Sequence, residues 1–173
     1  MNKIGKVIVK EFLDWIKAIG LAIIIVYFVQ KFIFINLTIP SLSMYPTLQV
    51  GDRCISTRLS YLFSEIERGD VIIFTPPFES DCLYVKRVIG LPGETIEGKD
   101  GMVYINGNLI PDYSAVIMNE DFGPFVIPED SYFMMGDNRN NSYDSRFWDN
   151  HFVTKEAIYG RVLFKYYPEF KLL

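Results

Sequence analysis

Two short segments of this 173-residue chain carry hydroxyl and amine groups in settings that could support nucleophilic catalysis. In the first, Ser41 and Ser43 lie between Pro40 and Pro46. Because proline restricts the backbone, these hydroxyls would be held on a rigid segment. Serine and proline are also common in linkers, so a linker is an alternative. In the second, Lys86 interrupts an apolar stretch. A serine becomes a good nucleophile when a neighbouring base accepts its proton, and a lysine can be that base only when it is neutral.

The segment that carries the lysine is expected to be a β-strand, Tyr84–Ile89. Residues of a strand alternate between its faces, so Lys86 would share a face with Tyr84, Val88 and Gly90. Burial against such an apolar wall lowers the pKa of a lysine from its free value of about 10.4. The alternative is a lysine on an edge strand whose amine reaches water and stays charged.

A dense polar run, Met135–Arg146, follows another apolar stretch. Ordering so many polar groups is costly unless they satisfy one another. Asp144 and Arg146 could form an ion pair, and Ser142 could hold another group by hydrogen bonding. A solvated loop would explain this composition equally well.

The N-terminal part of the chain contains a predominantly apolar segment, Trp15–Ile35. About 20 such residues cross a bilayer as a helix. Four basic residues, Lys3, Lys6, Lys10 and Lys17, precede the apolar core of this segment, whereas the far side offers only Lys31 before Arg53. The positive-inside rule therefore predicts a cytoplasmic N-terminus and membrane anchor in residues 1–35, with an extracytoplasmic domain in residues 36–173. A cleaved signal peptide is less favoured, because the residues after the apolar segment are bulky.

The rest of the chain reads as mainly β, a small and mostly antiparallel fold. Asn106-Gly107 is a strong signal for a hairpin turn, and Ser60–Glu67 is expected to form a helical turn or two. Arg68 and Asp70 are expected to order a charged turn before a buried strand. The predicted strands are Arg53–Thr57, Asp70–Phe74, Tyr84–Ile89, Met102–Ile105, Tyr132–Met135 and Ala157–Tyr166.

Composition excludes several function classes. A net charge of −4 and a pI near 5.0 give no indication of the basic surface that binding to nucleic acid requires. The single histidine, His151, excludes a histidine-cluster metal site and is expected at the surface. Cys54 and Cys82 lie far apart in the sequence, and either a disulfide or two buried free thiols is compatible with that spacing.

Four segments, in this order and spacing, resemble the bacterial type I signal peptidases, the leader peptidase family of Ser-Lys dyad serine proteases. They are Ser41–Leu48 (SLSMYPTL), Arg68–Phe74 (RGDVIIF), Tyr84–Glu94 (YVKRVIGLPGE) and Gly136–Arg146 (GDNRNNSYDSR). The resemblance implies the family's β-fold, shared with repressor-type proteases, on one transmembrane helix. It also implies a membrane enzyme that removes signal peptides from exported preproteins and uses neither a metal nor another cofactor.

The resemblance assigns roles to matching positions. Ser43 corresponds to the nucleophile and Lys86 to the general base. Ser41 looks like the side-chain donor of the oxyanion hole, beside the backbone N–H of Ser43, and Ser142 resembles the residue that orients the lysine. The positions similar to the family's structural ion pair are Asp144 and Arg146, with Asp137 beside them.

The resemblance further implies that substrate binds as an extended strand beside Tyr84–Lys86. Shallow pockets would accept small residues at the first and third positions before the cut. Leu42 stands where several relatives carry glycine, and we expect it to alter the pocket beside the nucleophile. The residues expected to line the pockets are Ile39, Pro40, Met44, Leu48, Tyr84 and Val85.

Three other hypotheses stand as alternatives. A membrane-anchored assembly factor for pili or surface proteins would use the same fold without catalysis. A self-cleaving Ser-Lys repressor would need a DNA-binding domain and a scissile loop, and the apolar segment and acidic charge disfavour it. An anchored β-domain without chemistry leaves the four ordered segments unexplained.

Overall fold

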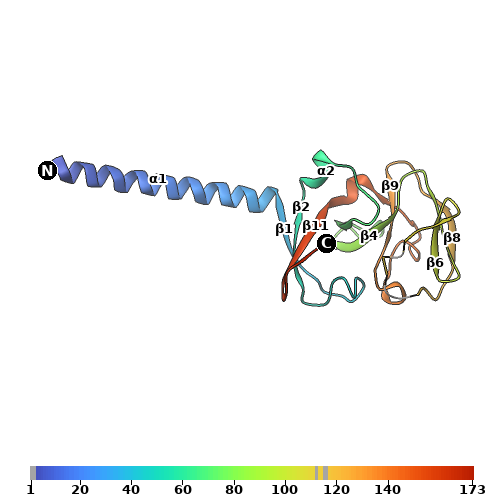
Figure 1. Cartoon of the computed structure of the whole chain (residues 1–173). Helices are drawn as coiled ribbons and strands as arrows, with labels where there is room; N and C mark the ends of the chain where they lie inside the picture. Colours follow the sequence, from blue (N-terminus) through green and yellow to red (C-terminus); the bar gives the residue numbers. More distant parts are fainter. Residues whose placement is uncertain (1–2, 112, 115–116) are drawn as a thin grey trace. The chain divides into compact units, whose positions relative to one another are not determined.

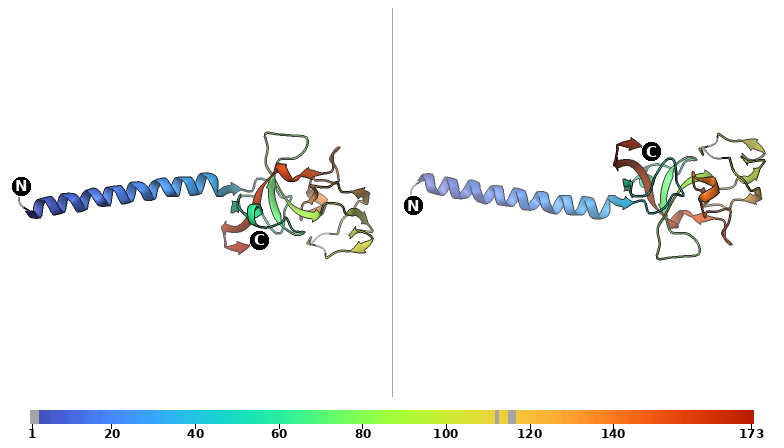
Figure 2. Two further views of the ribbon diagram at one scale, coloured as in Figure 1. Left: turned by 90° about the horizontal axis from the view of Figure 1, so that it is seen from above. Right: turned by 90° about the horizontal axis from the view of Figure 1, so that it is seen from below.

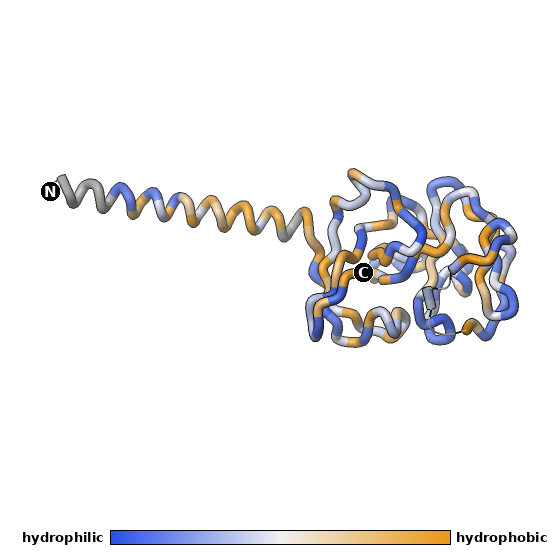
Figure 3. Tube along the Cα trace, viewed as in Figure 1, coloured by the Kyte–Doolittle hydropathy of each residue, from blue (hydrophilic) through white to orange (hydrophobic). Residues whose placement is uncertain are grey.

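The computed structural model describes residues 3–111, 113–114 and 117–173. The chain divides into two compact units, Met1–Ile35 and Asn36–Leu173. In the first, helix α1 runs over Lys3–Phe32 (Figure 1). No residue of its segment Lys10–Val29 is buried, and this segment is long and apolar enough to cross a membrane. Figure 3 shows the apolar residues concentrated in the second half of this helix.

The helix ends earlier than the apolar segment does. We expected an apolar anchor up to Ile35, but α1 stops at Phe32 and strand β1 begins at Phe34, running to Thr38. β-Branched and aromatic residues favour a strand wherever a partner strand is available. In this chain β2 supplies that partner, so the last apolar residues belong to the sheet.

The second unit is built mainly from antiparallel strands in two sheets (Figure 2). The larger sheet has the order β1-β2-β11-β3-β4-β9-β10, and β12 pairs with β11 at one end. A short helix, α2 (Ser60–Phe63), follows β2. The remaining strands of this sheet are β2 (Arg53–Thr57), β3 (Val71–Phe74), β4 (Tyr84–Gly90), β9 (Ser131–Met135), β10 (Val153–Thr154), β11 (Ile158–Tyr167) and β12 (Lys171–Leu172).

The smaller sheet has the order β7-β6-β5-β8. Two 3-10 turns, Arg139–Asn141 and Lys155–Ala157, lie between strands of the larger sheet. The strands of the smaller sheet are β5 (Thr95–Lys99), β6 (Met102–Ile105), β7 (Asn108–Leu109) and β8 (Phe122–Val126).

Strand β4 contributes to two apolar cores. Val88 belongs to a cluster with Phe74, Met134 and Trp148, whereas its neighbour Ile89 belongs to the cluster that the smaller sheet covers. Alternation along the strand explains this division, because successive side chains point to opposite faces. The larger sheet is therefore buried on both faces at β4, the strand that carries Lys86.

The predicted mainly antiparallel β-fold is confirmed, and each of the six predicted strands overlaps an observed one. The predicted hairpin is also present: Ile105 pairs with Asn108, and Asn106 and Gly107 have φ values of 50° and 76°. A turn of this kind needs positive φ at both positions. The helical turn expected within Ser60–Glu67 is the short α2.

Strand β8 was not predicted, because the pair Gly123-Pro124 is typical of a turn and not of a strand. The structure accommodates both residues, since β8 is an edge strand, where a missing N–H costs no ladder bond. Gly123 has φ +79°, and a Cβ there would lie 2.7 Å from the carbonyl oxygen of Ile96 on β5. The close approach of the two strands requires glycine.

The charged turn before β3 is ordered by Asp70, as expected. Its carboxylate accepts hydrogen bonds from Tyr61 Oη at 2.9 Å and from the backbone N–H of Glu67 at 3.2 Å. Arg68 instead reaches out of the turn and pairs with Glu94 at 2.6 Å. Arg68 thereby ties this turn to the connection between β4 and β5.

The two cysteines are not paired. Cys54 is a buried free thiol on β2, and Cys82 is an exposed free thiol in the loop before β4. The hypothesis of a disulfide between them is therefore wrong, and so is the alternative that both free thiols are buried.

Gly160 lies where β11 passes from β3 to β2, and a Cβ there would collide with the carbonyl oxygen of Thr57. Because backbone cannot yield as a side chain can, we expect Gly160→Ala to lower the free energy of unfolding by about 3 kcal/mol. Thermal and urea unfolding of the full chain in detergent would measure this.

Gly107→Ala is the control, because position 107 has positive φ but open space around it. Its expected cost is about 1 kcal/mol, from backbone conformation alone. Equal losses in the two variants would show that β11 and β2 do not approach as closely as described.

Candidate active site

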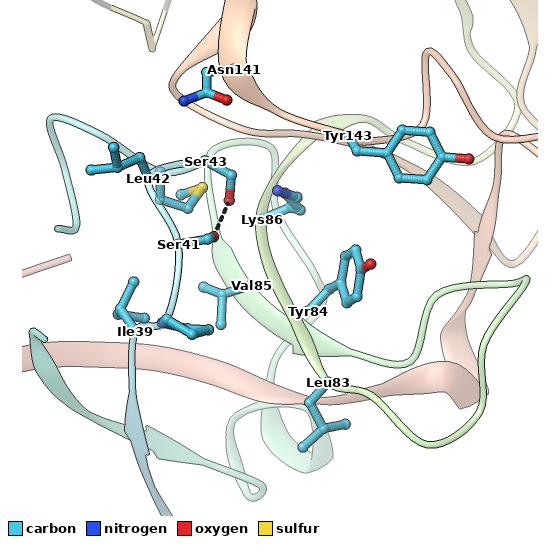
Figure 4. A pocket seen from close by; sticks show the side chains of 12 residues that line it. Ile39, Ser41, Leu42, Ser43, Leu83, Tyr84, Val85, Lys86, Asn141 and Tyr143 are labelled. Carbon is cyan, nitrogen blue, oxygen red and sulfur yellow. Dashed lines mark hydrogen bonds between the residues drawn. The ribbon is translucent and has the colours of Figure 1, made fainter. Parts of the chain in front are cut away.

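A cavity of about 370 Å³ opens in the β-domain where the segment after β1 meets the start of β4 (Figure 4). Its walls are mostly apolar, but they include two serine hydroxyls and one amine. The residues that line it are Ile39, Pro40, Ser41, Leu42, Ser43, Met44, Leu83, Tyr84, Val85, Lys86, Asn141 and Tyr143.

The segment Ser41–Leu48, called the serine turn below, is compact and is held by hydrogen bonds within its own backbone. Tyr45 N donates to Leu42 O at 3.0 Å, and Leu48 N donates to Met44 O at 2.9 Å. The side chains of Met44 and Leu48 are almost completely buried, which fixes the turn to the domain. The serines are therefore presented by a segment that the core holds in place.

The hydroxyl oxygens of Ser41 and Ser43 lie 3.2 Å apart, within hydrogen-bonding distance. The carbonyl of Ser43 accepts from the backbone N–H of Asn138 at 3.0 Å, and the Asn138 side chain donates to Leu42 O at 3.1 Å. Across the described residues, the N–H of Ser43 has no acceptor. One hydroxyl and one amide thus remain available as donors beside Ser43 Oγ.

Lys86 is buried, with 3% of its surface exposed. On the sheet it pairs with Ile72 of β3 and shares its face with Val88, so its stem rests on the apolar cluster below. Burial lowers the pKa of Lys86 to about 8, and the nearby Arg146 acts in the same direction. The carboxylate of Asp144 opposes them and raises this pKa.

Figure 4 shows Ser43 and Lys86 projecting into the same cavity from two different segments. Within the described part of the chain no hydrogen bond joins Ser43 to Lys86. In free enzymes such catalytic hydrogen bonds are often long and tighten when substrate binds. The arrangement brings a hydroxyl and a readily deprotonated amine together, which is what serine nucleophilic chemistry requires.

Asp137 joins the serine turn to the lysine strand. Its carboxylate accepts a hydrogen bond from Thr47 Oγ1 at 2.5 Å. Arg87 donates to both of its oxygens, from Nε to Oδ1 at 2.8 Å and from Nη2 to Oδ2 at 2.5 Å. Asp137 is completely buried. Thr47 lies in the serine turn and Arg87 is next to Lys86, so one carboxylate holds both segments.

The expected ion pair between Asp144 and Arg146 is present. Arg146 Nε lies 2.8 Å from Asp144 Oδ1, and its Nη2 lies 2.9 Å from Oδ2. Asp144 also accepts the N–H of Gly136 at 2.9 Å. Gly136 is packed so tightly that a Cβ would collide with Ser142 Oγ and with Ser43 O. The pair therefore supports the backbone directly behind Ser43.

Ser142 is buried, and its hydroxyl has no hydrogen-bond partner among the described residues. It lines a second cavity of about 150 Å³, together with Arg139 and Arg146, and does not line the larger one. The role in orienting Lys86 that we expected for Ser142 stays a prediction.

Five of the six residues expected to contact substrate line the larger cavity: Ile39, Pro40, Met44, Tyr84 and Val85. Leu48 does not line it, and its side chain is wholly buried in the domain. Leu42 does line it, and its backbone is outside the left-handed region, so this position does not need glycine here.

Three of the lining residues, Leu83, Asn141 and Tyr143, were not predicted from the sequence. Leu83 shares a face with Val85 by strand alternation, which is a signal that could have identified it. Asn141 and Tyr143 belong to the dense polar run, where the sequence gives no periodicity by which to orient side chains.

His151 does not line the cavity. It is partly buried where we expected a surface position, stacked on Phe125 with ring centroids 3.9 Å apart. Its Nδ1 lies 2.6 Å from the carbonyl oxygen of Ser145. Among the residues that the structure describes, no group of three or more His, Cys, Asp or Glu side chains could hold a metal ion.

Comparison with known proteins identifies the class. A model of the signal peptidase family, peptidase S26, matches residues 12–167. The signal peptidase I of Leptolyngbya laminosa is 41% identical over 165 residues, covering 90% of this chain and 80% of that protein. Signal peptidase I S of Bacillus subtilis (strain 168) is 38% identical over 171 residues, covering 92% and 91%.

A solved signal peptidase I from Enterococcus faecalis V583 is 32% identical, with a TM-score of 0.49 over 57% of this chain and 97% of that one. The sequence matches, which extend over most of the chain, define the protein as a peptidase. Within that class it belongs to the signal peptidase family, peptidase S26.

The buried amine of Lys86 should make stability depend on pH. Its folded-state pKa of about 8 lies below the ordinary value of 10.5, so the unfolded chain binds the proton more tightly. Lys86 therefore costs stability below about pH 8, and that cost is relieved as pH rises from 8 to 10.5. Lys86→Met should be more stable than wild type at pH 7, on the order of 3 kcal/mol.

Thermal unfolding of both proteins in detergent, from pH 7 to pH 10.5, would measure the difference. We expect it to shrink with rising pH, whereas Lys99→Met, at an exposed lysine, should show no such trend. A Lys86→Met variant no more stable than wild type at pH 7 would mean that the amine is not desolvated.

Proposed function

We propose that this protein is a membrane-bound serine endopeptidase that removes N-terminal signal peptides from exported preproteins, with Ser43 as nucleophile and Lys86 as general base. The observation that carries the proposal is the buried amine of Lys86, whose pKa is lowered to about 8 in the cavity that also holds Ser43. Membership of the signal peptidase family supplies the substrate class.

The reaction follows from these groups. Neutral Lys86 accepts the proton of Ser43 as Oγ attacks the scissile carbonyl, and the developing oxyanion takes hydrogen bonds from Ser41 Oγ and the N–H of Ser43. The ammonium of Lys86 then gives its proton to the leaving amine, which departs as the new N-terminus. Lys86, neutral again, activates a water that hydrolyses the acyl-enzyme ester and frees Ser43.

Substrate would lie as an extended strand along Tyr84–Lys86. Side chains at the first and third positions before the cut would then point into the cavity, toward Ile39, Met44 and Val85. These walls leave shallow space, which suits small residues. Asp144, Arg146 and Asp137 act as supports that hold the reacting groups, and we assign Ser142 to orienting Lys86.

The rival proposal is a non-catalytic assembly factor of the same fold. Binding alone would not require a buried lysine, since replacing a desolvated amine by an apolar side chain would stabilise the domain. The retained serine turn and buried amine therefore favour catalysis.

Cleavage of a model preprotein by the detergent-solubilised full chain tests the proposal. We expect Ser43→Ala and Lys86→Ala each to abolish detectable cleavage. For wild type, kcat/KM should rise about tenfold per pH unit and level off above about pH 8, because only neutral Lys86 is active. Normal cleavage by both variants would refute the mechanism.

In the same assay Ser41→Ala should lower kcat about 10²–10³-fold with little change in KM, as the loss of one oxyanion donor does. Thr47→Ser, which keeps the hydroxyl that donates to Asp137, is the control and should retain activity. A Ser41→Ala effect on KM alone would place this hydroxyl in ground-state binding.

We further propose that residues 1–35 form a cytoplasmic N-terminus and membrane anchor, and residues 36–173 an extracytoplasmic catalytic domain at the cell membrane, in contact with membrane lipid. The basic residues before the apolar segment support this orientation. We propose no contact with nucleic acid, in keeping with the acidic charge.

Cys82 allows a direct test of orientation, because its thiol is exposed whereas that of Cys54 is buried. A membrane-impermeant maleimide added to intact cells should label the wild-type chain and not Cys82→Ser. Labelling only after the cells are opened would reverse the proposed orientation.

A further inference from the structure

We propose that Tyr143, which lines the cavity, and Phe78, which packs on Tyr143 from outside the cavity, form an apolar wall on the leaving-group side. This wall would select a large apolar or aromatic side chain at the second residue after the scissile bond. The inference rests on the proposed function and adds a specificity on the side of the mature protein.

The wall consists of aromatic rings that continue outward from the lysine. Tyr84, whose ring centroid is 5.9 Å from Lys86 Nζ, contacts Phe78 with centroids 5.9 Å apart. Phe78 in turn contacts Tyr143 at 5.6 Å. Tyr84 and Tyr143 both line the cavity. The rings therefore form one continuous surface that begins at the reacting groups.

This surface is both exposed and held in place. Tyr143 is 54% exposed and Phe78 is 48% exposed, so each offers a ring face to a ligand. Beneath them lies Trp148, which is 1% exposed and whose centroid is 5.7 Å from Phe78 and 6.5 Å from Tyr143. A wall fixed by a buried indole loses little conformational entropy when a side chain packs on it.

The chemistry identifies which half of the substrate meets the wall. In the proposed mechanism Ser41 Oγ donates to the oxyanion of the scissile carbonyl, and Lys86 must lie beside the leaving amine to give it a proton. Figure 4 shows Asn141 and Tyr143 on one side of the Ser43–Lys86 pair, and Ile39 and Leu83 on the other. With the acyl half of the substrate along Ile39 and Leu83, the leaving half runs toward Tyr143.

Strand alternation then selects the residue. If the first and third residues before the cut point into the cavity, the first residue after it points away and the second points in again. An alanine at that second position is too short to cover a ring, whereas a phenylalanine would pack edge-to-face or offset on Tyr143 and Phe78. Such aromatic pairs are favourable beyond the area they bury.

Soluble peptides that differ only after the scissile bond test the inference. With the full chain in detergent, a peptide with Phe as the second residue should have roughly tenfold higher kcat/KM than its Ala counterpart. Tyr143→Ala and Phe78→Ala should bring this ratio close to one, whereas Tyr143→Phe should keep it because the ring remains. Tyr159→Ala, at a tyrosine of similar exposure outside the cavity, should also keep it.

Each other outcome overturns the inference. Equal cleavage of both peptides by wild type would refute the wall's selectivity while leaving the proposed function intact, whereas cleavage of neither would remove the proposed function as well. A preference that resides at the first residue after the cut would refute the alternation argument. A Tyr143→Ala effect seen only in vesicles, and equal for both peptides, would assign the rings to the bilayer surface.

Discussion

The whole site depends on keeping one amine out of water. Lys86 loses its proton readily because its charged form is poorly solvated, and that condition is met by packing the strand between two apolar cores. The same packing makes the lysine a cost to folding below about pH 8. The β-structure around the cavity is thus the means by which a lysine, whose amine would otherwise be protonated, becomes available as a general base near neutral pH.

Apolar packing alone would not suffice, because acidic groups lie close to the amine. Asp144 and Asp137 each raise the pKa of Lys86 and would favour its charged form. Both are held by arginines, Asp144 by Arg146 and Asp137 by Arg87. The arginines neutralise the carboxylates in pairs, which weakens their field at the lysine while keeping them as acceptors for Gly136 N–H and Thr47 Oγ1. The ion pairs therefore serve the electrostatics of the base as well as the shape of the site.

The sequence predicts regular strands and motifs well, but it predicts poorly where side chains of irregular segments point. Alternation along Tyr84–Ile89 correctly placed Lys86 on the face of Val88, because that pattern is set by local geometry. The same alternation was wrong for Gly90, which faces the other cluster because the strand register shifts between Val88 and Gly90. Strand β8 was missed because its glycine and proline become acceptable only at a sheet edge, which is a tertiary property. Tyr143 was missed for a similar reason: its place in the cavity comes partly from packing on Phe78, which is far away in the sequence.

Strand β4 explains why the lysine and the serine turn cannot be positioned independently. Lys86 points to one face of the sheet, while Arg87 points to the other and, through Asp137, holds Thr47 of the turn that carries Ser43. Pairing of Ile72 with Lys86 and of Val71 with Arg87 sets this register. A slip of one residue would send the amine to the wrong face and, in the same step, release the serine turn. The dyad therefore depends on strand register more than on any single contact between its two members.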